Sequence, residues 1–150
     1  MINGRRVAVV LPAYNAALTL KQTYDEIPFD IVDDVILTDD ASRDDTKEVS
    51  RSLGIHTLVH ENNRGYGGNQ KTCYAAALER GADIVVMLHP DYQYDATRIP
   101  ALVEVILTGA DLRGAVRWTV PERCGPDGCT WTTTTPRCAV GARPASPRCS

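Results

Sequence analysis

The sequence lacks the features that mark several large classes of protein. No apolar run approaches the roughly 20 residues that a membrane-spanning helix needs. The apolar stretch near the N-terminus stops at Pro12 without a small-residue cleavage site, so we expect no signal peptide. A net charge of −3 gives no general argument for binding nucleic acid or an anionic membrane surface. These absences favour a cytoplasmic protein.

Common ligand-binding motifs are missing as well. There is no Walker-type lysine loop, and Gly65-x-Gly67-Gly68 follows the third predicted strand without the spacing of a dinucleotide fingerprint. No C-x-x-C pair offers a strong zinc signal. What remains is 150 residues, 43% hydrophobic and 23% charged, which is ordinary for one globular domain.

The composition changes sharply near Asp111. Beyond it there is no lysine, isoleucine, phenylalanine, tyrosine or methionine, while arginine, proline and cysteine accumulate. Hydrophobic periodicity also stops there. We therefore divide the chain into a folded part, residues 1–110, and an irregular tail, residues 111–150. Such a tail is what truncation or a shifted reading frame of a longer protein would produce.

Residues 1–110 alternate between the hydrophobic periods of strands and helices. Short β-branched runs predict buried strands, and amphipathic stretches between caps and stop residues predict helices. Four strand–helix pairs with short links favour an α/β fold with a mostly parallel sheet, helices on both faces and right-handed crossovers. The expected strands cover residues 6–11, 35–37, 56–59 and 84–88, and the expected helices cover about 15–27, 44–53, 69–80 and 95–107.

Three local features are expected at the boundaries of these elements. Pro12 should end the first strand because it has no N–H for the ladder. Asn15 and Asp95 should cap the first and last helices. The glycine-rich segment 62–68 should be a flexible loop.

Polar residues follow each predicted strand at the point where it ends. In a doubly wound sheet the loops after the strands converge on one edge, where such folds bind their ligands. The four polar segments are Pro12–Asn15, Asp39–Ser42, Asn63–Gly68 and His89–Asp95.

The segment His89–Asp95 follows an unbroken apolar run that breaks at Pro90. If the segment stays extended, His89, Asp91 and Gln93 point the same way. An imidazole, a carboxylate and an amide on one face can hold a divalent cation. The alternative is an ordinary polar surface turn.

The other segments offer groups that suit a nucleotide. Tyr14 can pack on a flat base, and a carboxylate at Asp39 or Asp40 can accept a hydrogen bond from a base N–H or a ribose hydroxyl. Arg64 and Lys71 lie beside glycines that let the backbone approach, so they can meet phosphate. Together these groups describe a nucleoside diphosphate with a metal on its phosphates.

Each of these features also has a structural interpretation. The Asp39–Asp40 pair can be a turn with a helix cap, and the glycines can be only a loop and a helix start. His56 and His60 are interpreted as strand and loop residues rather than ligands. Cys73, in an alanine-rich helix, is expected to be a small buried hydrophobe.

Four motifs, taken together, resemble the family 2 glycosyltransferases in order and spacing. The resemblance covers roughly residues 5–110 and is closest to the branch with polyprenyl-phosphate (dolichyl-phosphate-type) mannosyl- and glucosyltransferases. It implies a GT-A fold, incomplete here, and inverting transfer of a sugar from a nucleotide-diphosphate donor, of UDP or GDP type. The motifs are Pro12-Ala-Tyr-Asn, Leu37-Thr-Asp-Asp-Ala-Ser-Arg-Asp, Asn63-Arg-Gly-Tyr-Gly-Gly and His89-Pro-Asp-Tyr-Gln-Tyr-Asp.

The resemblance also implies roles for individual residues. His89-Pro90-Asp91 stands where the family usually has an Asp-x-Asp metal motif, and Gln93 is retained after it. The imidazole suits Mn²⁺ better than Mg²⁺, so Mn²⁺ is the preferred expectation. Ala16 stands where family members commonly have a glutamate. The residues expected to bind the donor nucleotide are Pro12, Tyr14, Asn15, Asp39, Asp40, Arg64 and Lys71.

The acceptor side is less well represented in the sequence. An inverting transfer needs a base, or an acceptor such as a polyprenyl phosphate that is already ionised. No residue of the tail matches the family's catalytic aspartate, so no base is named. The alternatives are a catalytically inactive nucleotide-binding fragment and a zinc or disulfide unit in the tail. An active enzyme with a polyprenyl-phosphate acceptor would work peripherally at the inner membrane face. The cysteines of the tail are Cys124, Cys129, Cys138 and Cys149.

Overall fold

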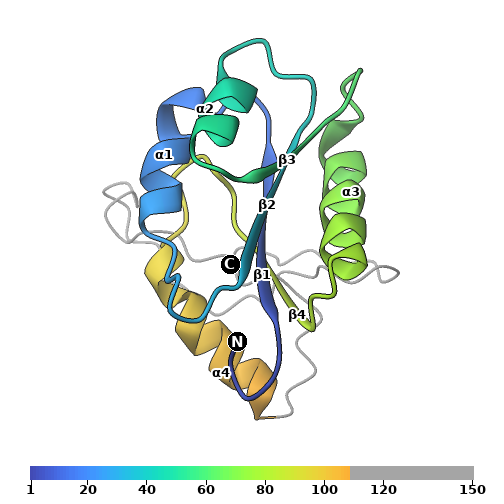
Figure 1. Ribbon diagram of the computed structural model, residues 1–150. Coiled ribbons are helices and arrows are strands. Elements are labelled where there is room, and N and C mark those ends of the chain that lie inside the picture. Colours follow the sequence, from blue (N-terminus) through green and yellow to red (C-terminus); the bar gives the residue numbers. More distant parts are fainter. Residues whose placement is uncertain (109–150) are drawn as a thin grey trace, which may run out of the picture.

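The structure, a computed structural model, describes residues 1–108, and the expectations for the tail at 111–150 lie outside the described residues. Strands and helices alternate along this part of the chain, as predicted (Figure 1). The elements are β1 (Val7–Ala13), α1 (Ala17–Asp25), β2 (Asp34–Asp39), α2 (Thr46–Ser52), β3 (His56–Val59), α3 (Gly65–Glu79), β4 (Ile84–Met87), a short 3-10 helix η1 (Ala96–Arg98) and α4 (Ile99–Leu107).

The four strands form one parallel sheet in the order β3-β2-β1-β4. Strand β2 pairs with one edge of β1, and β3 pairs with the outer edge of β2. The chain then passes through α3 and returns to place β4 on the other edge of β1. Strand β1 therefore lies in the middle, with Val10 opposite Ile36 on one side and Met87 on the other. The order reverses between β1 and β4, and a crevice opens at such a switch point beyond the carboxyl ends of the strands.

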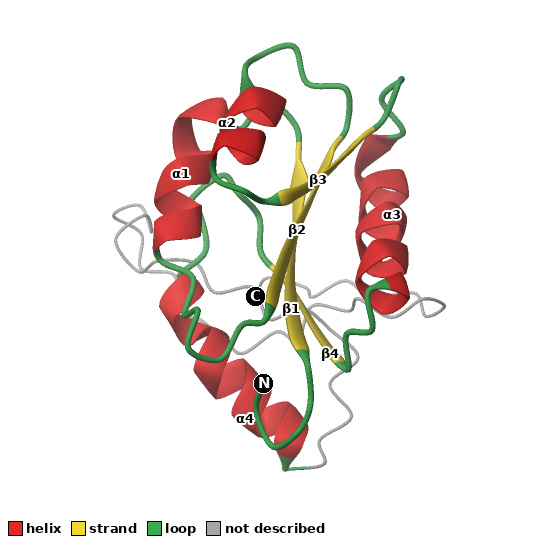
Figure 2. Ribbon diagram, viewed as in Figure 1, coloured by secondary structure: helices red, strands yellow, loops and turns green. Residues whose placement is uncertain are grey.

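Helices cover both faces of the sheet (Figure 2). Of the helices that the structure describes, α3 covers one face, and α1, α2 and α4 cover the other. Strand β1 can be covered on both faces because successive side chains of a strand point to opposite faces, and those of β1 are apolar on both. Val9 and Leu11 pack in the cluster that includes residues of α1 and α4, whereas Ala8 and Val10 pack against Cys73 and its neighbours on α3. The α/β fold with a two-sided parallel sheet is thus confirmed.

Pro12 lies inside β1 and does not end it, so that prediction is wrong. Val10 accepts a hydrogen bond from Leu88 N, which shows that the backbone groups of Val10 face β4. Pro12, two residues on, faces the same way. Since β4 ends at Met87, the missing N–H of Pro12 falls where no partner strand needs it.

Helix α3 begins at Gly65, four residues before the predicted start, so Gly65–Gly68 form its first turn and only residues 62–64 of the glycine-rich segment remain in the loop. Asn63 Oδ1 accepts from Gly65 N at 2.9 Å, and Asp40 Oδ1 accepts from Arg64 N at 2.8 Å. These side chains satisfy backbone donors that a helix start otherwise leaves unpaired. A Cβ on Gly68 would lie 2.7 Å from the Cβ of Arg64, so the absence of a side chain at this position permits the turn.

The last helical segment starts as predicted. Asp95 accepts from Thr97 N and caps η1, which leads directly into α4. Within residues 1–108, no helix is both long enough and apolar enough to cross a membrane.

Candidate functional site

A cavity of about 330 Å³ lies at the carboxyl ends of β1 and β4, at the switch point of the sheet. Its walls come from the loops after β1 and β4, from the end of β2 and from the start of α3. The lining residues are Pro12, Ala13, Tyr14, Asn15, Ala16, Thr19, Asp40, Asn63, Gly65, Tyr66, Asn69, His89, Pro90 and Asp91.

A second cavity, of about 560 Å³, lies at the opposite end of the sheet, near Asp34, His56 and Arg80. It is larger, but it stands at the amino ends of β2 and β3, where α/β sheets do not usually bind ligands. Its Asp34 is already paired with Arg80. The cavity at the carboxyl ends is therefore the better candidate.

The predicted site residues divide into two groups in the structure. Some line the cavity, and others lie away from its surface. Pro12, Tyr14, Asn15, Asp40, His89 and Asp91 line it, whereas Asp39, Arg64, Lys71 and Gln93 do not. Arg64 is exposed and directly follows the lining residue Asn63, while Lys71 is exposed farther along α3.

Asn15 connects two loops and does not cap α1, so its predicted capping role is wrong. It adopts a φ of 51°, a left-handed conformation that asparagine tolerates. Its backbone N donates to Ser42 Oγ at 2.8 Å, and its Oδ1 accepts from Arg43 N at 2.9 Å. The first N–H groups of α1 instead donate to Thr46 Oγ1 and Asp44 Oδ2. Side chains from the β2–α2 loop (Asp44) and from the first residue of α2 (Thr46) thus cap α1.

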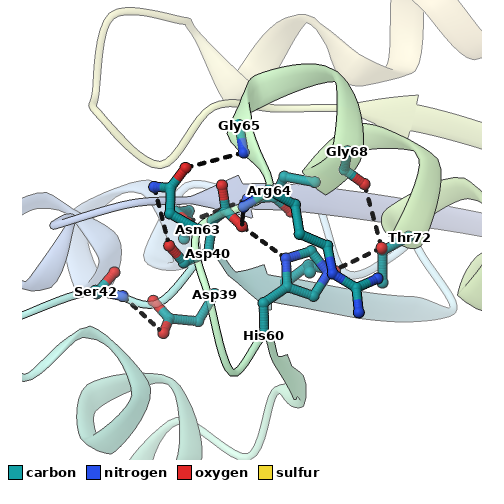
Figure 3. A network of polar contacts seen from close by, with 12 residues as sticks. Asp39, Asp40, Ser42, His60, Asn63, Arg64, Gly65, Gly68 and Thr72 are labelled. Atoms are coloured by element: carbon teal, nitrogen blue, oxygen red, sulfur yellow. Dashed lines mark hydrogen bonds and ion pairs between the residues drawn. The ribbon is translucent and has the colours of Figure 1, made fainter.

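The neighbouring Asp39 and Asp40 have different environments (Figure 3). Asp39 Oδ2 accepts from Ser42 N at 3.1 Å, while its Oδ1 is buried and has no hydrogen-bond partner among the described residues. Asp40 is 3% exposed and lines the cavity. Alternation along the strand separates the two carboxylates, so only one of them reaches the cavity surface.

Asp40 is the centre of a buried polar network (Figure 3). Its Oδ1 accepts from His60 Nδ1 at 2.7 Å and from Arg64 N at 2.8 Å. The other imidazole nitrogen, Nε2, lies 2.9 Å from Thr72 Oγ1 on α3. Burial raises the pKa of Asp40, but the hydrogen bonds from Arg64 N and His60 outweigh it and hold the pKa below its ordinary value. Asp40 is therefore ionised and accepts only.

Asp44 is a second carboxylate whose pKa is lowered. Burial acts to raise its pKa, but hydrogen bonds from Thr46 and from Ala17 N lower it further than burial raises it. A carboxylate whose pKa is lower in the folded state stabilises the protein fully when the pH is above its unfolded-state pKa. This stabilisation is lost as the pH falls through its folded-state pKa.

We therefore expect the free energy of unfolding to fall as pH drops through and below the ordinary pKa of 3.8 that Asp40 and Asp44 have when unfolded. Urea titrations at several pH values measure this. Asp44→Asn should make the free energy of unfolding fall less steeply with acidification. An equally steep fall in that variant would contradict a lowered pKa of Asp44 in the folded state.

The segment after β4 turns sharply and is not extended. Gln93 N donates to Asp91 Oδ1 at 3.1 Å, and Tyr92 has a φ of 57°. The condition of an extended segment, on which His89, Asp91 and Gln93 would share one face, is therefore not met. Thr19 of α1 donates to the carbonyl oxygen of Pro90 and holds the turn at the cavity.

His89 lies in a stack of aromatic rings. Its ring centroid is 5.4 Å from that of Tyr66 and 5.2 Å from that of Tyr94, with interplanar angles of 22° and 26°. Tyr66 Oη and His89 Nε2 are 3.0 Å apart. One nitrogen of the imidazole, Nε2, thus faces a tyrosine hydroxyl at the wall of the cavity.

The described residues contain no cluster of three His, Cys, Asp or Glu side chains that could hold a metal ion. At the cavity, Asp91 is exposed and offers an anionic oxygen ligand. Mg²⁺ commonly binds through one or two carboxylates together with substrate phosphates, and Mn²⁺ takes similar oxygen ligands. The residues present therefore fit a cation that arrives with a diphosphate, rather than a complete protein metal site.

Several residues at this site were not identified from the sequence. Asn69 is buried and donates to the carbonyl oxygen of Ala13, and Tyr66 stacks on His89. His60 was interpreted as a strand or loop residue, but it joins the Asp40 network. Its position directly after β3, at the edge where the other polar segments meet, was the signal that could have identified it.

Comparison with known families agrees with this architecture. The sequence pattern described as Glycosyl transferase family 2 matches residues 8–128, most of the chain. The chain belongs to glycosyl transferase family 2, and the predicted family resemblance is confirmed.

The relatives include polyprenyl-phosphate sugar transferases. An undecaprenyl-phosphate mannosyltransferase of Micrococcus luteus is 32% identical over 116 residues, covering 71% of this chain and 46% of that protein. A UDP-N-acetylglucosamine–dolichyl-phosphate N-acetylglucosaminyltransferase of Methanococcus voltae is 26% identical over 118 residues, covering 67% of this chain and 47% of that protein. The chain thus spans about half the length of the curated relatives it matches.

Solved structures give the same fold. Glucosyl-3-phosphoglycerate synthase from Mycobacterium tuberculosis, in complex with Mn²⁺, UDP and glucosyl-3-phosphoglycerate, aligns with a TM-score of 0.60 and 30% identity. The alignment covers 71% of this chain and 41% of that chain. The same enzyme in complex with UDP aligns with a TM-score of 0.62. The predicted GT-A fold is confirmed.

Proposed function

We propose that residues 1–108 form the donor-binding half of an inverting glycosyltransferase that takes a sugar from a nucleotide-diphosphate sugar. The observation that carries this proposal is the cavity at the switch point. There, Tyr14, Asp40 and Asp91, from three separate loops, surround one space of about 330 Å³. A cavity of that size suits a small organic ligand.

The chemistry of the lining assigns a part of the donor to each region. Tyr14 is 51% exposed at the rim, where its ring can stack on the base. Asp40 accepts from a base N–H or a ribose hydroxyl. Pro12 and Asn15 shape the same wall. Asp39 lies behind this wall and acts on the β2–α2 loop through Ser42.

The diphosphate would lie toward the start of α3 and the turn after β4. Arg64, exposed beside the lining residue Asn63, can approach it, and Lys71 can add positive charge from farther along α3. Asp91, together with His89, would hold a divalent cation, Mn²⁺ or Mg²⁺. Such a cation would supply positive charge beside the departing nucleoside diphosphate. The complex of the mycobacterial relative with Mn²⁺ and UDP supports this arrangement.

Relatives described as undecaprenyl-phosphate and dolichyl-phosphate sugar transferases support a polyprenyl phosphate as the acceptor. A phosphate acceptor is already ionised near neutral pH, so the transfer needs no protein base to deprotonate a hydroxyl. This fits the cavity, whose only carboxylates among the described residues are Asp40 and Asp91. With such an acceptor, the chain would work at the inner face of a membrane.

A nucleotide-binding chain without turnover is the second candidate. The observation that favours it is the same shortage of carboxylates, because an acceptor with a hydroxyl nucleophile would have no base among the described residues. Mixing the chain with labelled nucleotide sugar and a polyprenyl phosphate separates the two candidates. Labelled lipid supports the transferase, and binding without labelled lipid supports the second candidate.

Calorimetric titration of UDP and of GDP into the folded chain tests the donor site. With Mn²⁺ present we expect one nucleotide to bind, and with EDTA we expect binding at least about tenfold weaker, because the cation joins Asp91 to the diphosphate. No binding of either nucleotide to a chain with a native circular dichroism spectrum would overturn the proposal. Equally tight binding with EDTA would show that nucleotide binding needs no cation, and the metal would then be dropped from the proposal.

A further inference from the structure

His60 is a buried titratable residue without a role in the chemistry described so far. It directly follows β3, is 7% exposed and does not line the cavity. Its backbone N donates to the carbonyl oxygen of Asp39 at 2.9 Å, which places the histidine beside the end of β2. A buried imidazole with both nitrogens engaged holds its neighbours in a fixed geometry.

The two ring nitrogens of His60 face groups on different elements. Nδ1 lies 2.7 Å from Asp40 Oδ1, and since an ionised carboxylate only accepts, Nδ1 carries a proton. Nε2 lies 2.9 Å from Thr72 Oγ1, whose hydroxyl also lies 3.2 Å from the carbonyl oxygen of Gly68. His60 therefore connects the cavity-lining carboxylate of Asp40, directly after β2, to the second turn of α3.

The same carboxylate also holds the segment that enters α3. Asp40 Oδ1 accepts from Arg64 N, and the carbonyl oxygen of Asp40 accepts from Asn63 Nδ2 at 3.2 Å. Asn63, Gly65 and Asp40 all line the cavity. The orientation of the carboxylate and the position of this wall are consequently determined together.

We propose that His60 is a positioning residue, which through Asp40 Oδ1 and Thr72 Oγ1 holds the Asp40 carboxylate and the start of α3 in the geometry that the donor nucleoside requires. This inference rests on the proposed donor-binding function. His60 itself does not touch the donor. Groups behind a binding site commonly act in this way, because a contact residue recognises its ligand only while its own rotamer is held.

Variants of His60 separate a positioning role from a merely structural one. Asparagine places its amide nitrogen close to the position of the imidazole Nδ1 and can still donate to Asp40, whereas leucine cannot. His56 is the matched control, because it is an exposed histidine at the other end of the same strand. Thr72→Val removes only the hydroxyl that faces Nε2.

The experiment is calorimetric titration of the nucleotide that binds the wild-type chain, with Mn²⁺. We expect at least about tenfold weaker binding for His60→Leu, within about threefold of wild type for His60→Asn, and no change for His56→Leu. Equal binding by His60→Leu and wild type would overturn the inference, as would an equal loss in His60→Asn and His60→Leu.

If His60→Leu does not fold, Thr72→Val decides. Binding weakened about threefold or more supports the inference, and unchanged binding overturns it. Absence of binding by the wild-type chain is a separate result, because it overturns the proposed donor site itself.

Discussion

Asp91→Asn is expected to reduce Mn²⁺-dependent nucleotide binding by at least about tenfold, while leaving the weak binding in EDTA unchanged. Asparagine keeps the size of the side chain and can still accept from Gln93 N, so the turn after β4 is retained. Only the negative charge that attracts the cation is lost. Calorimetry with and without Mn²⁺ measures both quantities on one preparation.

Asp45→Asn is the matched control for this change of charge. Asp45 is exposed and makes no side-chain capping hydrogen bond at the start of α2, so its replacement should leave binding and folding unchanged. If Asp91→Asn binds as well as Asp45→Asn in Mn²⁺, then Asp91 does not hold the cation and the metal assignment fails.

Asp40→Ala is expected to have the largest combined effect on folding and binding. Removing the carboxylate leaves Arg64 N and His60 Nδ1 without their buried acceptor. Loss of one partner from a buried polar pair of this kind costs about 3 kcal/mol of the free energy of unfolding. We also expect nucleotide binding to fall below detection, because the acceptor for the nucleoside is gone.

Urea denaturation measures the stability change, and titration of the folded fraction measures binding. Asp34→Ala serves as the control, because Asp34 begins the same strand and pairs with Arg80 near the surface. An ion pair at such a site is worth at most about 1 kcal/mol. A loss no larger for Asp40→Ala than for Asp34→Ala would mean that the Asp40 network does not stabilise the fold.

Hydrophobic periodicity was sufficient to predict the elements that depend on local pattern. Strand His56–Val59 has the predicted bounds, and Cys73 is a small buried residue as expected. Both properties follow from the neighbouring sequence, through the period of a strand and the composition of a helix. The parallel sheet with helices on both faces then follows from the general rules for α/β crossovers, whereas the strand order β3-β2-β1-β4 does not.

The wrong predictions concern residues whose state depends on distant partners. Whether Pro12 can stay in β1 depends on where β4 ends, and the start of α3 depends on Asp40, which directly follows β2. Asn15 was expected to cap a helix, but Asp44 of the next loop and Thr46 at the start of α2 take that role. Local pattern carries no information about such contacts.

The candidate site likewise has features that local sequence predicts and features that depend on distant contacts. Sequence motifs identified Asp39 and Asp40 as a pair, but the packing of α3 against one face determines which of them reaches the cavity. The aromatic stack of Tyr66, His89 and Tyr94 joins residues from two elements and could not be found from spacing alone.

The donor nucleotide is proposed to bind at the carboxyl ends of β1 and β4. Nuclear magnetic resonance of the ¹⁵N-labelled chain, titrated with UDP or GDP in the presence of Mg²⁺, tests it most directly. If the nucleotide binds there, amide shifts change at Tyr14, Asp40, Gly65 and Asp91, around the cavity of about 330 Å³. Changes confined instead to the opposite cavity, near His56 and Arg80, would contradict it.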